Sequence, residues 1–462
     1  MLEKRPFAYT EEKMADDLTS KGRNIVEPSI LAGFQEFLPK EQMLFTHMLD
    51  TIRYSFESYG FIPLDTPVLE KSQVLLAKSG GDTAKQVYRF EKGDTDMAMR
   101  FDLTVPLARY VAQHYDSLVF PFRRYHIGKV YRGERPQKGR FREFYQCDID
   151  IIGNETLSLL NEAELVSVIN STFGALDIGD FTVMINNRKL LGGFFSSLGI
   201  DDPTEALRAV DKLDKIGGDK VLEELVSQGV SAEAAGKIIA LTSVCGAPET
   251  VFKKLDEMGL AGCSAAFDEG LSELKTVCAY IKKFGVPEKR FCVDLKIARG
   301  LDYYTGTVYE TKLNDYPELG SICSGGRYDD LASNYTKKKL PGVGISIGLS
   351  RLFYQLNAAG IISIDGRSTP SEVLLIPMGD TLDYTLDAAE KIRSEGIPCE
   401  TYMGEGKLGK KFGYADKLGI PYAVVIGEDE RDSGIITVKD MRTGEQRSYE
   451  SASEFARTIK KV

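Results

Sequence analysis

The chain has 462 residues, of which 43% are hydrophobic and 27% charged, and its formal net charge is −10. This length exceeds what one hydrophobic core usually supports, so more than one domain is expected, and the composition is typical of soluble globular proteins. The negative charge argues against a broadly basic surface that coats nucleic acid, although it leaves room for a local basic groove.

Cysteine usage and the N-terminus indicate the expected compartment. The seven cysteines form no C-x-x-C pair and no zinc-type spacing, which predicts neither a disulfide framework nor a structural metal. Most of them are expected to be small buried hydrophobic side chains. No run of about 18 apolar residues predicts a membrane span, and the charged start MLEKRPFAYTEEKMADD lacks the apolar core of a signal peptide. A cytoplasmic protein without a membrane partner is expected.

The first predicted elements are a short strand and a long helix. Residues 1–25 form a polar N-terminal extension, and Glu27–Pro39 are predicted to hold a short strand. From Lys40 apolar residues recur at helical spacing, and Gly60 can end that helix. The following stretch, 61–69, reads as an irregular strand whose two prolines place it at a sheet edge or an interface. This helix and strand could pair two subunits or pack on their own domain.

A hairpin and a helix start come next. The stretches 88–90 and 97–101 are predicted strands around a turn at Gly93. Pro106 suits the first position of the next helix, which makes Val105 a poor N-cap and leaves the Thr104 hydroxyl available for another partner. Asp102, taken alone, is most simply a turn residue or a partner of the helix dipole.

The chain is organised around residues 122–153. Two flanks that alternate like strands, 125–131 and 141–152, enclose a polar turn broken by Pro136 and Gly139, so an antiparallel hairpin is predicted. Four cations lie in its loop: Arg132, Arg135, Lys138 and Arg140. The second flank carries Gln146, Asp148 and Asp150 where a strand is normally apolar.

A solvated charged hairpin is the plain alternative for this stretch. The interleaved aromatic residues and the misplaced acidic residues favour a functional site instead. Cations beside carboxylates on one hairpin suit a substrate with a polyphosphate at one end and an amine at the other.

The residue composition and pattern change twice in the rest of the chain. A helix over 154–172 and a strand over 181–185 precede a stretch rich in Leu, Ala, Glu and Lys, which is predicted to be a mostly helical insertion. Later predictions are strands over 290–298 and 307–311, a glycine turn over 324–329, and a small-residue strand over 341–348 that leads into a helix. From Ser371 strands and helices alternate, which predicts a small α/β module.

Three arginines stand out because each follows a strand that looks buried. Arg132 is near Glu134 on the hairpin, Arg299 precedes two tyrosines, and Arg351 follows a glycine-spaced strand. Isolated arginines are usually surface residues, but this set predicts convergence on phosphates. The glycines around Gly344 do not form a dinucleotide fingerprint, because Gly348 falls one residue late for it.

Several common catalytic motifs are missing from the sequence. It has no P-loop and no H-E-x-x-H or other metal-ligand cluster, so no metal site built by protein side chains is predicted. Of its three histidines, His126 in the hairpin is expected to be packed or hydrogen-bonded rather than a base. The site is therefore expected to work by positioning and charge stabilisation without a general base.

From about Ile30 to the C-terminus the chain resembles the histidyl-tRNA synthetases, which are class II aminoacyl-tRNA synthetases. Motif 1 is matched by Pro67 after the long helix, motif 2 by Val130–Glu134 with the loop to Arg140 and by 141–144, and motif 3 by 344–352. These motifs indicate class II. The runs ARGLDYYTG at 298–306 and GGRYD at 325–329 resemble the signature specific to histidine, which is the strongest part of the match.

The resemblance implies an α+β fold, with an antiparallel sheet catalytic domain interrupted by a helical insertion and followed by a C-terminal α/β anticodon-binding domain. The expected divisions of the chain are 1–25 for the extension, 26–187 and 286–356 for the catalytic domain, 188–285 for the insertion, 357–370 for a linker and 371–462 for the anticodon-binding domain. The implied activity is histidine–tRNA ligase, with ATP as a substrate together with Mg²⁺ and no tightly bound organic cofactor. The implied partners are tRNA(His), L-histidine and a second copy in a homodimer.

The resemblance also implies roles for individual residues. Arg132 and Arg299 would be catalytic and hold the α-phosphate, with Arg299 in place of a metal ion that other class II enzymes use there. Phe144 and Arg351 would sandwich adenine, with Glu134 near its amino group. Histidine would be bound by Asp102, Leu103, Thr104, Gln146, Asp150, Arg299, Tyr303, Tyr304 and Tyr328. The tRNA would be bound by Arg135, Gln137, Lys138 and Arg140.

Within the histidine set, Asp102, Thr104 and Gln146 would take the α-ammonium group. Asp150 and Tyr304 would read the imidazole ring, because its two nitrogens need an acceptor and a hydroxyl, and a wrong amino acid would leave both unpaired. Asp102 and Asp150 stand where many bacterial members carry Glu, whereas the motif 2 loop looks bacterial.

Two further expectations concern the C-terminal part and a rival function. Four lysines near the second helix of the C-terminal module could form a phosphate patch or a solvated helix face: Lys407, Lys410, Lys411 and Lys417. The rival function is a non-catalytic regulatory subunit of ATP phosphoribosyltransferase. Such subunits resemble only the catalytic domain and tend to lose the signature around Arg299, whereas this chain has both the signature and the C-terminal module.

Overall fold

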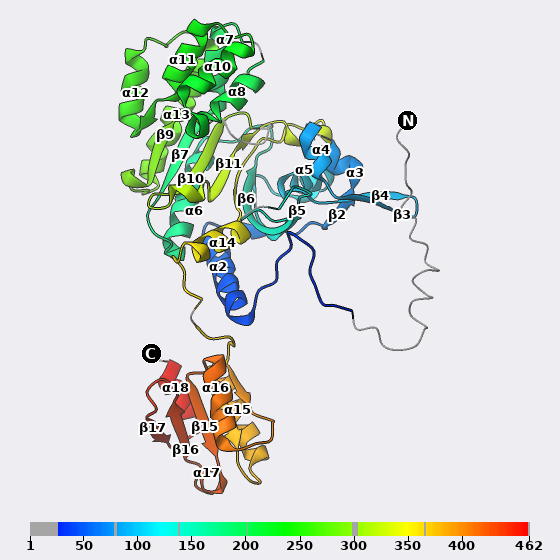
Figure 1. Cartoon of the computed structure of the whole chain (residues 1–462), viewed down its shortest axis with the longest axis vertical. Helices are drawn as coiled ribbons and strands as arrows, with labels where there is room; N and C mark the ends of the chain where they lie inside the picture. The colour runs from blue at the N-terminus through cyan, green and yellow to red at the C-terminus, as the bar shows by residue number, and fades with distance from the viewer. Residues whose placement is uncertain are drawn as a thin grey trace.

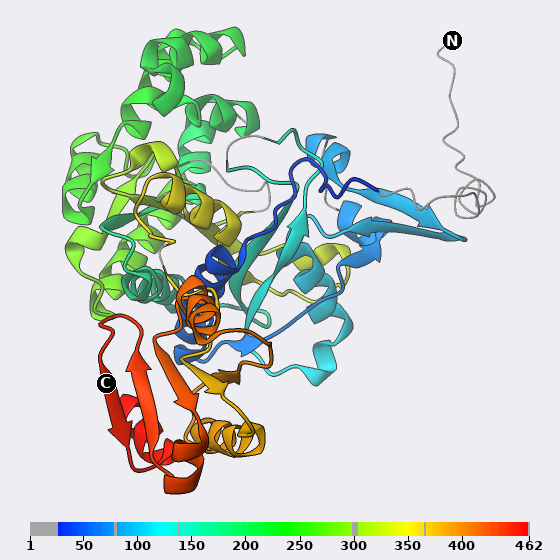
Figure 2. The same cartoon turned by 60° about the horizontal axis from the view of Figure 1, so that its bottom comes forward.

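The computed structural model describes residues 26–77, 81–136, 139–200, 202–297, 304–364 and 366–460. Figures 1 and 2 show a large N-terminal part built around one sheet and a small C-terminal part, joined by an extended segment. Among the described residues no helix is long and apolar enough to cross a membrane.

The large part is organised by a nine-stranded sheet with the order β1-β5-β6-β12-β11-β10-β7-β9-β8. In this order the strands are β1 (Ile62–Pro63), β5 (Phe122–Tyr131), β6 (Glu143–Ile152), β12 (Gly342–Ile347), β11 (Cys323–Tyr328), β10 (Thr307–Leu313), β7 (Phe181–Asn187), β9 (Phe291–Asp294) and β8 (Cys245–Gly246). The β1–β5 and β7–β9 pairs are parallel and the others antiparallel. The predicted antiparallel hairpin is confirmed as β5–β6.

Two helices cover one face of this sheet. Helix α2 (Pro39–Ser58) starts with proline at its first position, and the Glu41 carboxylate accepts a hydrogen bond from the Leu38 backbone N–H at 3.1 Å. Its buried side chains, which include Phe45 and Ile52, join a core with α6 (Leu160–Leu176) and the sheet. The apolar face of α2 therefore packs on its own domain, which is the second of the two alternatives that the sequence left open for this helix.

Two predictions in this region are wrong. No strand forms among the described residues of 27–38; this segment is irregular, with a turn at residues 32 and 33. Helix α6 begins six residues later than predicted, because Asn154 bridges to Thr156 and Glu155 adopts a left-handed backbone (φ 64°).

The start of α5 (Thr104–Gln113) also differs from the prediction. The helix begins two residues before Pro106, and the Asp102 carboxylate accepts a hydrogen bond from the Val105 backbone N–H at 3.0 Å. The predicted hairpin before it is confirmed as β3 (Arg89–Lys92) and β4 (Thr95–Met99), which form a three-stranded sheet with β2 (Leu69–Lys71). Two short helices, α3 (Ser72–Leu76) and α4 (Gly81–Gln86), accompany this sheet.

The predicted glycine turn over 324–329 is instead the strand β11. Its glycines serve close packing between strands: a Cβ at Gly325 would lie 2.1 Å from the Gly344 backbone oxygen, and one at Gly326 would lie 2.9 Å from the Tyr304 ring. The prediction that a backbone approaches closely here is correct, but the approach is within the sheet.

The insertion after β7 is helical, as predicted. Its helices are α7 (Arg188–Ser197), α8 (Thr204–Val210), α9 (Leu213–Ile216), α10 (Gly218–Ser227), α11 (Ala232–Thr242), α12 (Pro248–Glu257) and α13 (Ala265–Lys283). Helix α14 (Leu349–Ala358) follows β12, again as predicted.

The C-terminal part has a five-stranded sheet with the order β14-β13-β15-β16-β17. The predicted elements are confirmed as β13 (Val373–Pro377), α15 (Leu382–Ser394), β14 (Cys399–Thr401), α16 (Leu408–Leu418) and β15 (Tyr422–Ile426). Sequence reasoning missed the last four: α17 (Glu428–Ser433), β16 (Ile436–Asp440), β17 (Gln446–Tyr449) and α18 (Ala452–Lys460).

Two side-chain expectations need correction. Lys411 cannot join a lysine patch, because it is buried and donates a hydrogen bond to the Pro377 backbone oxygen at 3.0 Å.

Only three of the seven cysteines are buried (Cys147, Cys278 and Cys323), and Cys245 is exposed. All seven are free thiols.

Candidate active site

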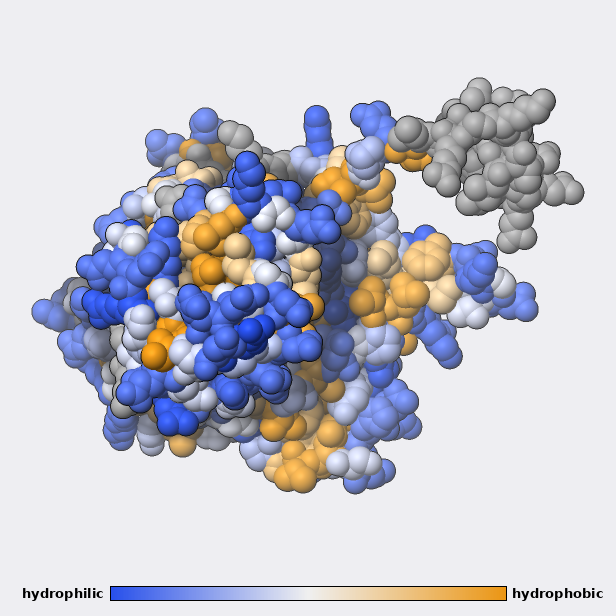
Figure 3. All heavy atoms as spheres, turned by 90° about the horizontal axis from the view of Figure 1, so that it is seen from below, coloured by the Kyte–Doolittle hydropathy of each residue, from blue (hydrophilic) through white to orange (hydrophobic). Residues whose placement is uncertain are grey.

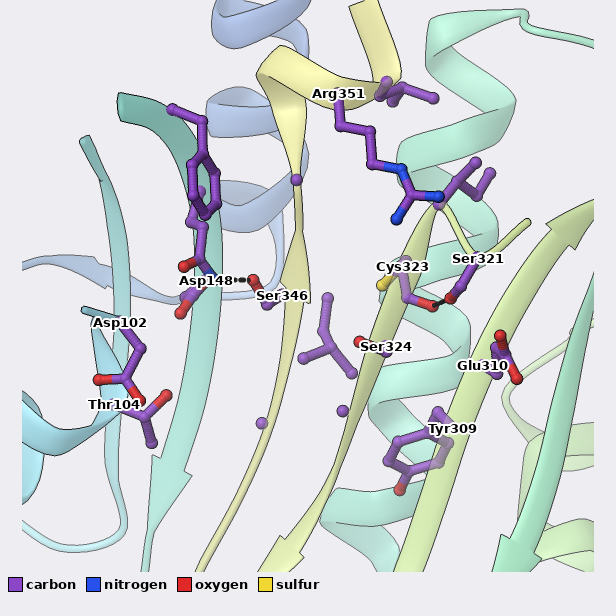
Figure 4. A pocket seen from close by; sticks show the side chains of 18 of the residues that line it. Asp102, Thr104, Asp148, Tyr309, Glu310, Ser321, Cys323, Ser324, Ser346 and Arg351 are labelled. Carbon is purple, nitrogen blue, oxygen red and sulfur yellow. Dashed lines mark hydrogen bonds between the residues drawn. The ribbon is translucent and has the colours of Figure 1, made fainter. Parts of the chain in front are cut away.

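A pocket of about 440 Å³ lies over the middle of the nine-stranded sheet. Alternate residues of β6 point to opposite faces, so Cys147, Ile149 and Ile151 enter the core with α2 and α6. The residues between them line the pocket: Phe144, Gln146, Asp148 and Asp150. Figure 4 shows Asp102 and Thr104 at one end of this pocket and Arg351 at the other.

The strand register places a row of polar side chains across the pocket floor. Asp148 lies opposite His126 on β5 and Ser346 on β12, and the row continues through Ser324 to Glu310. The Gln146 amide joins this row because its Nε2 donates to Ser346 Oγ at 2.6 Å.

Cationic and aromatic side chains gather at one end. The Arg132 guanidinium lies over the Phe144 ring, with Cζ 5.0 Å from the ring centroid, and its Nε donates to the Phe101 backbone oxygen at 3.2 Å. Arg351 reaches the pocket from the first turn of α14, where its Nη2 donates to the Leu319 oxygen at 3.3 Å. Glu134 also lines this end and pairs with Arg140 at 3.6 Å.

Acidic side chains gather at the other end. Asp102, Asp148 and Asp150 are all buried and line the pocket. Tyr328 Oη donates to Asp150 Oδ1, and Tyr304 lines the same end.

Burial governs the protonation of these carboxyls. It raises the pKa of Asp148 to about 7 and that of Asp150 to about 6, in each case against the opposing effect of the Arg124 guanidinium. The pKa of Asp102 is also raised by burial, while the Val105 backbone N–H and Arg132 act in the opposite direction. A cationic ligand at this end would favour the ionised form of all three carboxyls.

His126 is packed and hydrogen-bonded, as the sequence predicted. It is 1% exposed, and its Nε2 lies 2.8 Å from Asp65 Oδ1. Burial and the cations Arg124 and Arg100 lower its pKa to about 3, so the ring is neutral. Among the described residues, no three His, Cys, Asp or Glu side chains are grouped to hold a metal ion.

The structure brings together most of the predicted site residues. Those that line the pocket are Asp102, Thr104, Arg132, Glu134, Arg140, Phe144, Gln146, Asp150, Tyr304, Tyr328 and Arg351. Leu103 does not line it: the side chain is fully buried, and its backbone oxygen accepts a hydrogen bond from Arg124. Arg135 is exposed and outside the lining. Arg299, Tyr303, Gln137 and Lys138 lie outside the described residues.

Asp148 was noted on the hairpin but given no ligand role, and Ser346 and Glu310 were not predicted as pocket residues. The signal for Asp148 was present, because it stands midway in the alternation from Phe144 to Asp150. Ser346 and Glu310 had no local signal, since they reach the floor only through strand pairing between distant segments.

Comparison with known proteins matches both parts of the chain. Residues 33–352 match the family model described as histidyl-tRNA synthetase, and residues 372–461 match that of an anticodon binding domain. A histidine–tRNA ligase from Clostridium tetani is 57% identical over 438 residues, which cover 95% of this chain and 99% of the relative. One from Stenotrophomonas maltophilia is 50% identical and covers 91% of this chain and 95% of the relative.

Solved structures give the same pattern. The crystal structure of histidyl-tRNA synthetase from Nostoc sp. PCC 7120 has a TM-score of 0.86 and 44% sequence identity, and the match covers 95% of this chain and 100% of that chain. A Bacillus halodurans protein described as an ATP phosphoribosyltransferase regulatory subunit/histidyl-tRNA synthetase has a TM-score of 0.70 at 20% identity, covering 85% of this chain and 97% of that chain, which is a likeness of fold alone.

Proposed function

The chain belongs to the histidyl-tRNA synthetase family, and we propose that its pocket is where this protein, as a histidine–tRNA ligase, activates L-histidine with ATP. The carboxylate of histidine attacks the α-phosphorus of ATP, which forms histidyl-adenylate and releases pyrophosphate. A terminal ribose hydroxyl of tRNA(His) then attacks the carbonyl carbon, histidine is transferred to the tRNA, and AMP leaves. The observation that carries this proposal is one pocket with cations and an aromatic ring at one end and three carboxylates at the other.

The cationic end suits the nucleotide. Arg132 is fixed before any ligand arrives, by its hydrogen bond to Phe101 and its stacking on two rings, so little reorganisation accompanies charge build-up at the α-phosphorus. The Phe144 ring and the Arg351 guanidinium reach the pocket from different elements and offer two flat faces for adenine. Arg299 is proposed from its sequence match alone as the second cation on the α-phosphate.

The acidic end suits the amino acid. Asp102, Thr104 and Gln146 offer oxygen atoms for the α-ammonium group, and Asp150, Tyr304 and Tyr328 offer partners for the imidazole nitrogens. Leu103 contributes through its backbone at most, and Tyr303 is proposed from the motif alone. An amino acid with an apolar side chain would leave the buried Asp150 without its partner, which is the basis for discrimination.

The remaining partners follow from the same family. ATP enters with Mg²⁺ as part of the substrate, and no tightly bound organic cofactor is proposed. The motif 2 loop, with Arg135, Gln137, Lys138 and Arg140, would meet the acceptor end of the tRNA, and the C-terminal part its anticodon.

A homodimer is proposed because exposed apolar residues, among them Ile62, Leu69 and Phe90, occur on β1 and on the three-stranded sheet. Figure 3 shows apolar surface on the projecting side of the large part, where this small sheet lies. The mass of the protein in solution, measured by light scattering, tests this proposal.

The regulatory-subunit alternative is not favoured. The relative at 57% identity spans both parts of the chain and is named a ligase, whereas the likeness to the Bacillus halodurans protein is one of fold alone.

The test is histidine-dependent exchange of pyrophosphate into ATP, followed by charging of tRNA(His). Wild-type protein should exchange with L-histidine and not without it. Arg299→Ala should abolish exchange with the fold retained, as judged by circular dichroism. Arg208→Ala is the matched control, because Arg208 is an exposed insertion residue whose ion pair is with Glu205 on its own helix. Wild-type protein that binds histidine but exchanges no pyrophosphate would overturn the proposal.

A further inference from the structure

One buried cation lies beside the acidic end of the pocket. The Arg124 side chain is 0% exposed, and it faces Asp150 directly across the β5–β6 pair. Its Nη2 is 2.6 Å from Asp150 Oδ2 and donates to the Leu103 backbone oxygen at 3.2 Å. Burying a guanidinium so completely is unfavourable unless its partners compensate for the lost water. The complete burial of the Arg124 guanidinium therefore calls for a functional explanation.

We propose that Arg124 is a positioning residue for histidine selection, which holds the Asp150 carboxylate negatively charged and in place to accept the N–H of the substrate imidazole. The inference rests on the proposed function and adds to it a residue that does not line the pocket.

Three neighbours hold the Asp150 carboxylate in place. Arg124 pairs with Oδ2, Tyr328 Oη donates to Oδ1, and the Gly344 backbone closes the third side, since a Cβ on Gly344 would lie 2.1 Å from Oδ1. Asp150 Oδ2 makes the ion pair but no hydrogen bond of good geometry among the described residues. The Asp150 carboxylate, which lines the pocket, is the acceptor we assign to the imidazole N–H.

Among the residues that the structure describes, the charges around Asp150 make Arg124 the deciding group. The carboxyls of Asp102, before α5, and Asp148, on the same strand, both disfavour a negative charge on Asp150. Arg132 opposes the rise in the pKa of Asp102 and is not among the groups that shift Asp150, and His126, on β5 with Arg124, has its pKa lowered to about 3 and carries no charge. The tyrosines facing this end are neutral: the pKa of Tyr328 is raised well above its usual value, by burial and by Asp150, and Tyr304, which lines the pocket, is a phenol.

Removing the guanidinium should therefore change how Asp150 titrates. The pKa of Asp150 is about 6 with Arg124 in place, because burial raises it and Arg124 opposes that rise. Without Arg124 the pKa of Asp150 would rise further, so a smaller fraction of the carboxyl would be ionised at pH 7. A neutral carboxyl is a weaker acceptor and leaves the imidazole N–H poorly paired.

The experiment measures exchange against histidine concentration from pH 6 to pH 9 with the full-length protein. Arg124→Met should raise the histidine KM at pH 7 by about tenfold or more, because the ionised fraction of Asp150 falls about tenfold for each unit by which its pKa rises above the pH, and it should leave the ATP KM within twofold. The histidine KM should fall again toward pH 9 as Asp150 ionises. Arg124→Lys keeps a cation and should retain the wild-type pH profile.

Two controls separate this role from a structural one. Arg109→Met removes another partly buried ion pair, that of Arg109 with Glu70, and should lower the thermal midpoint without changing the pH profile of the histidine KM. Asp150→Asn should raise the histidine KM at every pH, and adding Arg124→Met to it should raise that KM no further.

The outcomes are distinct. If Arg124→Met fails to fold, the double variant still decides, since a histidine KM in it above that of Asp150→Asn overturns the inference. A KM increase in Arg124→Met that is equal for ATP and histidine, or independent of pH, also overturns it. Absence of histidine-dependent exchange in the wild type would instead overturn the proposed function itself.

Discussion

Gly344 offers a sharp test of the site because its neighbours leave no room for a side chain. A Cβ added at this position would lie 2.1 Å from Asp150 Oδ1 and 2.6 Å from the Ile149 backbone oxygen. A normal carbon–oxygen contact is roughly 3.3 Å, so Gly344→Ala requires the carboxylate to move by about 1 Å. The Ile149 backbone oxygen belongs to the neighbouring strand β6 and must also give way, so we expect a small local separation of β6 and β12 together with the larger shift of the carboxylate.

A shift of that size at the acidic end should weaken selection of histidine more than it weakens the fold. Misplacement by about 1 Å can reduce a rate by about 100-fold, and we expect kcat/KM for histidine in pyrophosphate exchange to fall by about that factor. Overpacking should also reduce the free energy of unfolding by about 1–3 kcal/mol. The ATP KM should stay within a few-fold of wild type, because the predicted adenine partners lie at the other end of the pocket.

The matched control is Gly236→Ala in α11, where nothing lies within 4 Å of an added Cβ. That substitution should leave exchange unchanged and stabilise the helix by up to about 1 kcal/mol. If Gly344→Ala kept the wild-type kcat/KM for histidine and the wild-type thermal midpoint, the packing of Asp150 against β12 would not matter for binding histidine.

Three further predictions concern other groups. Asp148 has a pKa of about 7 in the folded protein and near 3.9 in the unfolded chain. The free energy of unfolding of the ligand-free protein, measured with urea, should therefore fall as the pH rises from 4 to 7. Asp148→Asn should reduce that fall by up to about 4 kcal/mol. Lys411→Met should leave the Pro377 oxygen unpaired and destabilise the C-terminal part by about 1–3 kcal/mol, whereas the exposed Lys417→Met should change it by less than about 0.5 kcal/mol in the same assay. Arg135→Ala should keep pyrophosphate exchange and lower kcat/KM for tRNA charging by about tenfold; equal loss in both assays would contradict its assignment to tRNA.

The elements whose apolar residues recur at a regular spacing were predictable from the local sequence. The apolar spacing after Lys40 gave α2, and the alternation around a Pro–Gly turn gave β5 and β6. The predictions failed where a tertiary contact outweighs a local preference. Gly325 and Gly326 look like turn residues, but they lie in a strand because only a residue without Cβ fits between neighbouring backbones.

The candidate site was predictable where its residues share one segment. Gln146 and Asp150 stand on one strand at even spacing, and the hairpin that carries Arg132 is continuous with it. Arg124 was missed although it lies on the same hairpin. An arginine beside another arginine at the start of a strand reads as solvent-exposed, and only the register with Asp150 reveals its burial.

The identity of residue 146 explains how opposite charges share one pocket floor. Arg132 Nη2 donates to Gln146 Oε1 at 3.5 Å, while Gln146 Nε2 donates to Ser346 Oγ at 2.6 Å and lies 3.4 Å from Asp148 Oδ1. A neutral amide can therefore accept from the cationic end and donate toward the acidic end at once. A glutamate here would add a fourth carboxylate to a buried acidic group and pair with Arg132, which would withdraw that cation from a phosphate. A lysine would pair with Asp148 and leave Arg132 facing a like charge. The amide is the side chain that keeps each end available for the ligand group of opposite charge.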